Sequence, residues 1–300
     1  MGDELMMSAP LSFFVQVDLF ADALVKYVPT IREDAARNPG MTITDILTEE
    51  NREALLGDMK AAEAAFHEAM MNEVREFGVE ADPSGLRTQW GDPGINEQVV
   101  KMIEEQYPVN EHKQEVIFYG PSNITLWFSL EKDMEPYKAQ NHSMGGCIDD
   151  DLMHYAPRLL YPYEPKAVFF QTGSNDIAGG IPLETILQNK KKMYGMFLEN
   201  MPDTQLIVCS GLPLPGRIQF WDATVKTNEL LKKMCEETDR LHFMDATDVM
   251  LTDRGPDSLR TSDGRYFHPS YFRMDRIHLN KKGHDAWTAL MKAKLAELGI

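Results

Sequence analysis

The amino-acid sequence predicts an α/β fold, in which a parallel sheet is covered by helices on both faces. Four short apolar runs, typical of buried strands, occupy residues 116–119, 167–171, 206–209 and 241–244. The segments between these runs carry apolar residues at the three- and four-residue spacing of helices. Repeated strand–helix units with continuously apolar strands are typical of parallel sheets, whose active sites lie at the carboxyl ends of the strands.

The first 110 residues carry helical patterns, and we identify no catalytic motif in them. One amphipathic helix is expected over residues 13–28, and a longer one is expected over residues 49–77. Residues 81–94 contain several prolines and glycines and predict a loop around Trp90. A further short helix is expected over residues 95–106.

The alternating pattern begins after this region and continues to the carboxyl terminus. Helices are expected at residues 125–134, 148–160, 183–200, 223–238 and 283–298, with one more extended piece at 138–142. The composition changes near Pro108 and Asn110. We therefore expect a helical accessory region, residues 1–112, followed by an α/β domain, residues 113–300.

Acidic side chains outnumber basic ones, and most of the excess lies in the helical region. The net charge is −17, and residues 1–110 hold 8 Lys and Arg against 21 Asp and Glu. A surface of this charge repels phosphate groups, so nucleic acid and anionic membranes are poor partners. Asp18 and Asp22 interrupt the apolar stretch near the start, so neither a signal peptide nor a membrane span is expected.

The cysteines are sparse and odd in number: Cys147, Cys209 and Cys235. Such a set argues against a disulfide framework and suits a reducing compartment, so we expect a cytoplasmic protein. His142 and His154 flank Cys147, which raises the question of a metal site, but the spacing fits no zinc signature.

Four polar stretches follow the predicted strands or lie in neighbouring loops, and they would meet at the carboxyl edge of the sheet. They are G-P-S-N at 120–123, N-H-S-M-G-G-C at 141–147, G-S-N-D at 173–176 and D-R-I-H at 275–278. Ser122, in the first stretch, stands between a strand and a helix. Backbone N–H groups at such a position are unpaired and favour negative charge.

These stretches hold the groups that acyl transfer by a serine requires. Ser122 would attack the substrate, His278 would act as base and then as acid, and Asp275 would orient His278 from three residues away. The N–H groups of Ser122 and Gly146, with the side-chain amide of Asn175, would stabilise the oxyanion. This set already supplies nucleophile, base and electrophilic donors, so we expect neither a metal nor a cofactor.

In order and spacing, the four stretches resemble the conserved blocks of the SGNH hydrolases, also called the GDSL esterase/lipase family. The resemblance covers about residues 113–300 and implies a flavodoxin-like three-layer α/β/α sandwich that hydrolyses esters or thioesters without a metal. It places Gly146 at the family's oxyanion glycine. The serine block departs from the usual G-D-S-L, because Pro121 and Asn123 replace the aspartate and the leucine. We expect this to affect turn geometry and substrate preference more than the reaction class.

The sequence leaves the substrate and the role of several side chains open. Candidates for lining the substrate pocket are Asn123, Cys147, Tyr266, Phe267, Tyr271 and Phe272, although the four aromatic residues fit a packed cluster equally well. The expected activity is a serine esterase for small or medium acyl esters, including carbohydrate O-acetyl groups. An acyltransferase with the same residues, or a non-catalytic binding protein on this fold, are the alternatives. The helical region would pack on the α/β domain or form a homo-oligomer interface, and its loop around Trp90 would reach the substrate entrance.

Overall fold

The computed structural model describes residues 18–31, 34, 37, 41–76, 93–255, 260–268 and 270–300. Its centre is a five-stranded sheet in the order β2-β1-β3-β4-β5, in which every neighbouring pair is parallel. The strands are β1 (Val116–Tyr119), β2 (Ala139–Asn141), β3 (Ala167–Phe170), β4 (Gln205–Cys209) and β5 (Leu241–Met244). This is the flavodoxin-like order, in which the chain reverses its direction of growth between β1 and β3.

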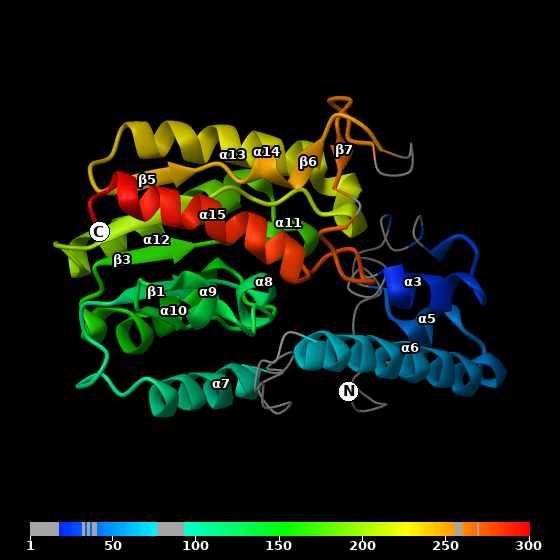
Figure 1. The fold of residues 1–300 in the computed structure, drawn as a ribbon. Helices are drawn as coiled ribbons and strands as arrows, with labels where there is room; N and C mark the ends of the chain where they lie inside the picture. Colours follow the sequence, from blue (N-terminus) through cyan, green and yellow to red (C-terminus); the bar gives the residue numbers. More distant parts are fainter. Residues whose placement is uncertain are drawn as a thin grey trace.

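Helices cover both faces of the sheet, as Figure 1 shows, so the predicted three-layer α/β/α class is confirmed. The helices of this body are α7 (Pro93–Gln106), α8 (Ser122–Thr125), α9 (Leu130–Met134), α10 (Asp149–Leu159), α11 (Ser174–Ala178), α12 (Leu183–Asn200), α13 (Trp221–Glu236), α14 (Thr247–Met250) and α15 (Lys281–Glu297). Two 3-10 turns, η2 (Tyr161–Tyr163) and η3 (Pro215–Phe220), lie among them.

Successive strand residues pack into two separate hydrophobic cores, because side chains alternate between the faces of a strand. On one face, Ile117 and Tyr119 of β1 join buried residues of α7, α10, α12 and α13. On the other face, Phe118 joins buried residues of α8, α9, α14 and α15, and its ring stacks on Phe169 of β3 at 4.8 Å. Burial on both faces explains why the strands are apolar throughout.

The predicted strands agree with the structure to within one residue at each end, but several other elements differ. The helix expected over 125–134 is two short helices, α8 and α9, because the Asp133 carboxylate accepts bonds from the Trp127 indole (2.8 Å) and the Ser129 hydroxyl (2.6 Å) in the turn between them. The antiparallel pair β6 (Leu251–Thr252) and β7 (Tyr266–Phe267) was not expected. Strands of two residues are too short to show a period.

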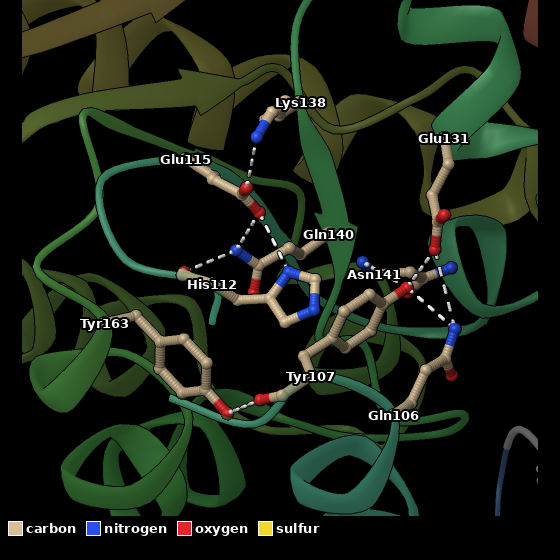
Figure 2. A network of polar contacts seen from close by, with 9 residues as sticks. All are labelled: Gln106, Tyr107, His112, Glu115, Glu131, Lys138, Gln140, Asn141 and Tyr163. Carbon is tan, nitrogen blue, oxygen red and sulfur yellow. Dashed lines mark hydrogen bonds and ion pairs between the residues drawn. The ribbon is translucent and has the colours of Figure 1, made fainter. Parts of the chain in front are cut away.

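Helix α7 packs into the α/β body, with Val99, Val100 and Ile103 in the same core as β1. Figure 2 shows the polar network where α7 ends beside β2. The Tyr107 hydroxyl donates to Glu131 (2.5 Å), and the Gln140 amide donates to the backbone of His112 (2.8 Å). The boundary at residue 112 stays a prediction, and this packing argues for an earlier one.

The amino-terminal helices α3 (Asp18–Val25), α5 (Ile43–Ile46) and α6 (Glu49–Glu76) lie beyond the carboxyl edge of the sheet (Figure 1). Helices α3 and α6 pack through buried residues such as Leu24, Leu55 and Met59, and Asp58 accepts bonds from Lys26 and Tyr27. Most of the loop expected around Trp90 lies outside the described residues. Within the described ranges, no helix combines the length and apolarity needed to cross a membrane.

Candidate active site

Ser122 lies where β1 meets α8, in a turn that requires a glycine. A Cβ atom on Gly120 would stand 2.2 Å from the backbone oxygen of Gln171, so only glycine lets this turn approach the end of β3. Pro121 then caps the helix, and Ser122 is its first residue. Among the described residues no acceptor takes the Ser122 N–H, which leaves this donor for a ligand.

Ser122, His278 and Asp275 form a continuous chain of hydrogen bonds. The Nδ1–H of His278 donates to Asp275 Oδ2 at 2.5 Å, and this fixes Nε2 as an acceptor. Nε2 lies 2.7 Å from the Ser122 hydroxyl, which therefore donates to it. All three side chains are at most 5% exposed. Ser122 and His278, which are 156 positions apart in the sequence, thus lie within hydrogen-bonding distance of each other.

Asp275 is held in its ionised form. Burial alone would raise the pKa of this carboxyl group, but the charge and hydrogen bond of His278 and the backbone N–H groups of His278 and Ile277 lower it, and the net direction is downward. Its Oδ1 atom accepts both backbone N–H groups at 3.0 Å, which leaves Oδ2 for the imidazole. A buried carboxylate of this kind can orient a histidine and stabilise its cation.

The three predicted oxyanion donors come from adjacent loops. The Met144 N–H donates to the Gly120 oxygen at 2.9 Å, which ties the glycine loop to the serine turn. Gly146 adopts a φ of 76°, and no acceptor within the described chain takes its N–H. The Asn175 amide donates to the Cys147 oxygen at 3.0 Å, so the asparagine loop lies against the glycine loop as well.

Comparison with known proteins agrees with this geometry. Residues 139–286 match the model of the GDSL-like Lipase/Acylhydrolase family, a range that contains the glycine, asparagine and aspartate–histidine blocks. This part of the chain is a GDSL-like lipase/acylhydrolase domain. The matched range accordingly identifies the chain as an enzyme of the lipase and acylhydrolase type. Ser122 precedes the matched range, so its place in the site rests on the contacts described above. A search of curated proteins found no match.

Solved structures of similar fold include proteins of the same kind. One is a GDSL-like lipase from Bacteroides thetaiotaomicron VPI-5482, with 18% identity, a TM-score of 0.54, and coverage of 68% of this chain and 98% of that chain. Another is described as a platelet activating factor from Streptococcus pneumonia, with 17% identity, a TM-score of 0.57, and coverage of 67% and 92%. At such identities the likeness concerns the fold.

Asn123 follows Ser122 and binds the loop of His278, and its role in lining the substrate pocket stays a prediction. Its side chain is 4% exposed and bridges to the histidine loop: Oδ1 accepts the Leu279 N–H at 2.9 Å, and Nδ2 faces the Ile277 oxygen at 3.4 Å. His284 is buried as well, and its Nε2–H donates to the backbone oxygen of Asn123 at 3.0 Å. Asn123 therefore holds the serine turn against the loop of His278.

Two more of the expected pocket residues belong to the hydrophobic core of the GDSL domain. Cys147 is buried among core residues, and burial and nearby acidic groups raise the pKa of its thiol. Phe267 packs against Trp221 and Leu251. A role of these two side chains in lining the substrate pocket stays a prediction.

The other three aromatic candidates are half-buried and make contacts of their own. The Tyr271 ring stacks on His268 at 3.5 Å, and Arg260 lies 5.9 Å from the centre of the Tyr266 ring. Phe272 packs against both the core that contains Phe118 and the cluster around Phe267. These contacts fit the packed cluster that the sequence left open. A role of these rings in substrate binding stays a prediction.

Two residues beside the candidate site were not expected from the sequence. Arg217 is buried and donates to Ser174 and Asn175; its only signal is a cation inside the apolar run L-P-L-P-G-R-I. Phe66 of α6 has its ring centre 6.4 Å from that of His278, with the planes tilted by 40°. No local pattern could indicate this contact, because it joins the accessory region to the histidine block.

A buried ion pair supports the asparagine loop of the GDSL domain. The Lys190 ammonium group donates to Asp149 Oδ1 at 2.7 Å, and so does the Thr172 hydroxyl. The Asp149 N–H donates to Asp176 Oδ1 at 3.2 Å. Gly173, with a φ of 99°, lets the loop turn directly over Lys190.

Asp176 makes the stability of the domain depend on pH. Burial, followed by the charge of Asp149, raises the pKa of Asp176 to about 6, above the value of about 3.9 for an exposed aspartate. The group therefore stabilises the fold fully below about pH 4, and that contribution is lost as the pH rises through about 6. Asp176→Asn should raise the melting temperature at about pH 8 more than at about pH 4.5, by a free energy of up to about 2 kcal/mol.

Thermal denaturation at the two pH values tests this prediction. The exposed Asp203→Asn variant serves as a control for the loss of one negative charge, and its melting temperature should change little at either pH. A decrease for Asp176→Asn that is equal at both pH values would show that titration of this carboxyl group is not responsible.

Proposed function

We propose that the protein is a serine esterase that hydrolyses small or medium acyl esters, with Ser122 as nucleophile, His278 as base and Asp275 as its partner. One observation carries this proposal: the chain of hydrogen bonds from the Ser122 hydroxyl through both nitrogens of His278 to Asp275, at 2.7 and 2.5 Å. A hydroxyl in such a chain is prepared to lose its proton to a neutral imidazole.

The proposed reaction has two halves. His278 Nε2 takes the hydroxyl proton while Ser122 Oγ attacks the acyl carbon, and the negative charge moves to the former carbonyl oxygen. The N–H groups of Ser122 and Gly146 and the amide of Asn175 stabilise this oxyanion. His278 then gives its proton to the departing alcohol, which leaves an acyl group on Ser122. A water molecule, deprotonated by His278, reverses these steps and releases the acid.

The enclosure of the site supports small or medium acyl groups. Ser122 and His278 are almost fully buried, and the ring of Phe66 lies close to the imidazole. Carbohydrate O-acetyl esters belong to this size class. A short acyl group such as acetyl needs less space beside the serine than a long chain, which would be expected to meet the ring of Phe66.

Labelling with a fluorophosphonate probe tests the proposed function. The probe forms a covalent bond only with an activated serine, so peptide mapping of the native chain should find it on Ser122. Release of p-nitrophenol from the acetate, butyrate and octanoate esters measures turnover. Label on another serine, or none on a chain that is folded by circular dichroism, would contradict the proposal.

We also propose that the accessory region, residues 1–112, shapes the substrate entrance through α6. Phe66→Ala removes the ring next to His278 and should leave space for longer acyl chains. The ratio of kcat/KM for the octanoate ester to that for the acetate ester is expected to rise roughly tenfold. The neighbouring exposed residue His67 provides the control, since His67→Ala changes the same helix away from the site. Equal ratios for both variants would exclude this role of Phe66.

A further inference from the structure

We propose that Arg217 is a positioning residue for the oxyanion hole, where its guanidinium group orients and polarises the side-chain amide of Asn175. This inference rests on the proposed function, since it assigns a task within the same site. Neither the four sequence blocks nor the triad contains Arg217, which lies in the turn η3 after β4. A buried cation that contacts a predicted oxyanion donor requires a chemical reason.

The backbone holds Arg217 beside the site. The N–H of Gly216 donates to the Arg276 oxygen at 2.8 Å, so η3 is fixed against the loop of Asp275 and His278. A Cβ atom on Gly216 would come within 3.0 Å of the Ile277 side chain and 3.1 Å of the Asp275 oxygen. A larger residue would therefore crowd the two loops, and the next residue, Arg217, is buried.

The Arg217 side chain is 7% exposed and uses one nitrogen for both contacts. Nη1 donates to the Ser174 hydroxyl at 2.5 Å and to Asn175 Oδ1 at 3.1 Å. Burial lowers the pKa of Arg217 to about 10, an effect opposed by the charge of Asp275. Because this value is well above neutrality, the guanidinium group is charged under working conditions.

The contact fixes which end of the Asn175 amide faces the reacting atoms. Arg217 can only donate, so it binds the amide oxygen and never the NH₂ group. At the other end, Nδ2 donates one hydrogen to the Cys147 oxygen at 3.0 Å. In a flipped amide, the NH₂ group would face the donor Arg217, and the amide oxygen would face the acceptor oxygen of Cys147. The second hydrogen of Nδ2 is thereby left in one defined direction for the oxyanion.

The same contact strengthens that hydrogen as a donor. A cation that binds the oxygen of an amide withdraws electron density from its nitrogen, and consecutive hydrogen bonds reinforce each other at low dielectric constant. The oxyanion carries a full negative charge, whereas the carbonyl oxygen of the bound ester carries only a partial one. Arg217 should therefore stabilise the transition state more than the bound ester, and its loss should appear in kcat rather than in KM.

A purely structural arginine would behave differently, and the domain provides one for comparison. Arg273 is also buried, but it donates to the backbone oxygen of Leu126 at 3.0 Å and lies over the ring of Phe128. Removing either arginine should lower the melting temperature. Only the effect of Arg217 on turnover should depend on the presence of Asn175.

A double-mutant cycle on the full-length chain tests this dependence. Arg217→Met keeps the length of the side chain without its charge, Arg217→Lys keeps the charge, and Asn175→Ala removes the amide. We expect Arg217→Met to lower kcat for p-nitrophenyl acetate roughly 10- to 100-fold, with KM changed less than about threefold. In the Asn175→Ala background, Arg217→Met should lower kcat less than about threefold. Arg273→Met should lower kcat by the same factor with and without Asn175.

Each outcome of the cycle has a definite meaning. Arg217→Lys should retain more turnover than Arg217→Met, and it keeps the test available if the methionine variant does not fold. Equal losses with and without Asn175, or a loss confined to KM or to the melting temperature, would overturn the role of Arg217. If the native chain takes up no fluorophosphonate at Ser122, the proposed function fails, and the role of Arg217 fails with it. If Ser122 is labelled but the effects of the Arg217 and Asn175 substitutions on kcat are additive, only the role of Arg217 is overturned.

Discussion

Ser122→Ala is expected to reduce kcat for p-nitrophenyl acetate by roughly 10⁴- to 10⁶-fold and to abolish fluorophosphonate labelling. The Ser122 hydroxyl makes one hydrogen bond within the described chain, to His278 at 2.7 Å, so its removal eliminates the nucleophile and leaves the surrounding packing unchanged. The melting temperature should therefore stay within a few degrees of that of the native chain. Residual turnover would come from the oxyanion donors and substrate binding alone.

Ser262 provides the matched control for this substitution. It is an exposed serine whose hydroxyl binds Asp222 outside the site, so Ser262→Ala should keep both labelling and turnover. Unchanged hydrolysis by Ser122→Ala would mean that another residue attacks the ester, and the proposed chain of hydrogen bonds would then have no catalytic role.

Asp275→Asn is expected to lower kcat by roughly 10³- to 10⁴-fold, and the structure explains why a substitution of the same shape is so damaging. The backbone N–H groups of Ile277 and His278 donate to Oδ1, so an asparagine would keep its oxygen there and point its NH₂ group at His278 Nδ1. Nδ1 would then become the acceptor, and Nε2 would carry the hydrogen. An imidazole in this tautomer cannot take the proton of Ser122.

Steady-state kinetics of the single and double variants measure this effect. If Ser122, His278 and Asp275 act as a unit, as proposed, adding Asp275→Asn to Ser122→Ala should cause little further loss. A full additional loss in the double variant, or near-normal turnover in Asp275→Asn, would show that the carboxylate does not control the tautomer of His278.

The sequence predicted the sheet well, because its signal is local and repeated. Val116–Tyr119 and Leu241–Met244 are strands with the boundaries expected from their apolar runs, since strands buried on both faces are apolar at every position. The grouping of Ser122, Gly146, Asn175 and His278 followed from the parallel topology, which brings the carboxyl ends of strands to one edge.

Side-chain roles within the site were harder to predict, because they depend on contacts between distant segments. Asn123 was expected to line the substrate pocket, and the structure adds that it binds the loop of Leu279, a contact that the sequence did not indicate. Cys147 and Phe267 pack in hydrophobic clusters. Arg217 looks like an ordinary cation in the sequence until the turn at Gly216 places it in the interior. A linear pattern gives the spacing of residues along the chain, not which face of a loop they occupy.

The contact between Phe66 and His278 joins the amino-terminal helix α6 to the proposed catalytic groups. The proposed catalytic groups lie in the GDSL domain and in the residues before it, whereas Phe66, whose ring is close to His278, lies in α6, far earlier in the chain. Under the proposed role of Phe66, replacement of α6 would change which esters enter the site and would leave the proposed catalytic groups in place. A comparison restricted to residues 139–286 does not include α6. It would therefore miss any difference in substrate that this helix causes.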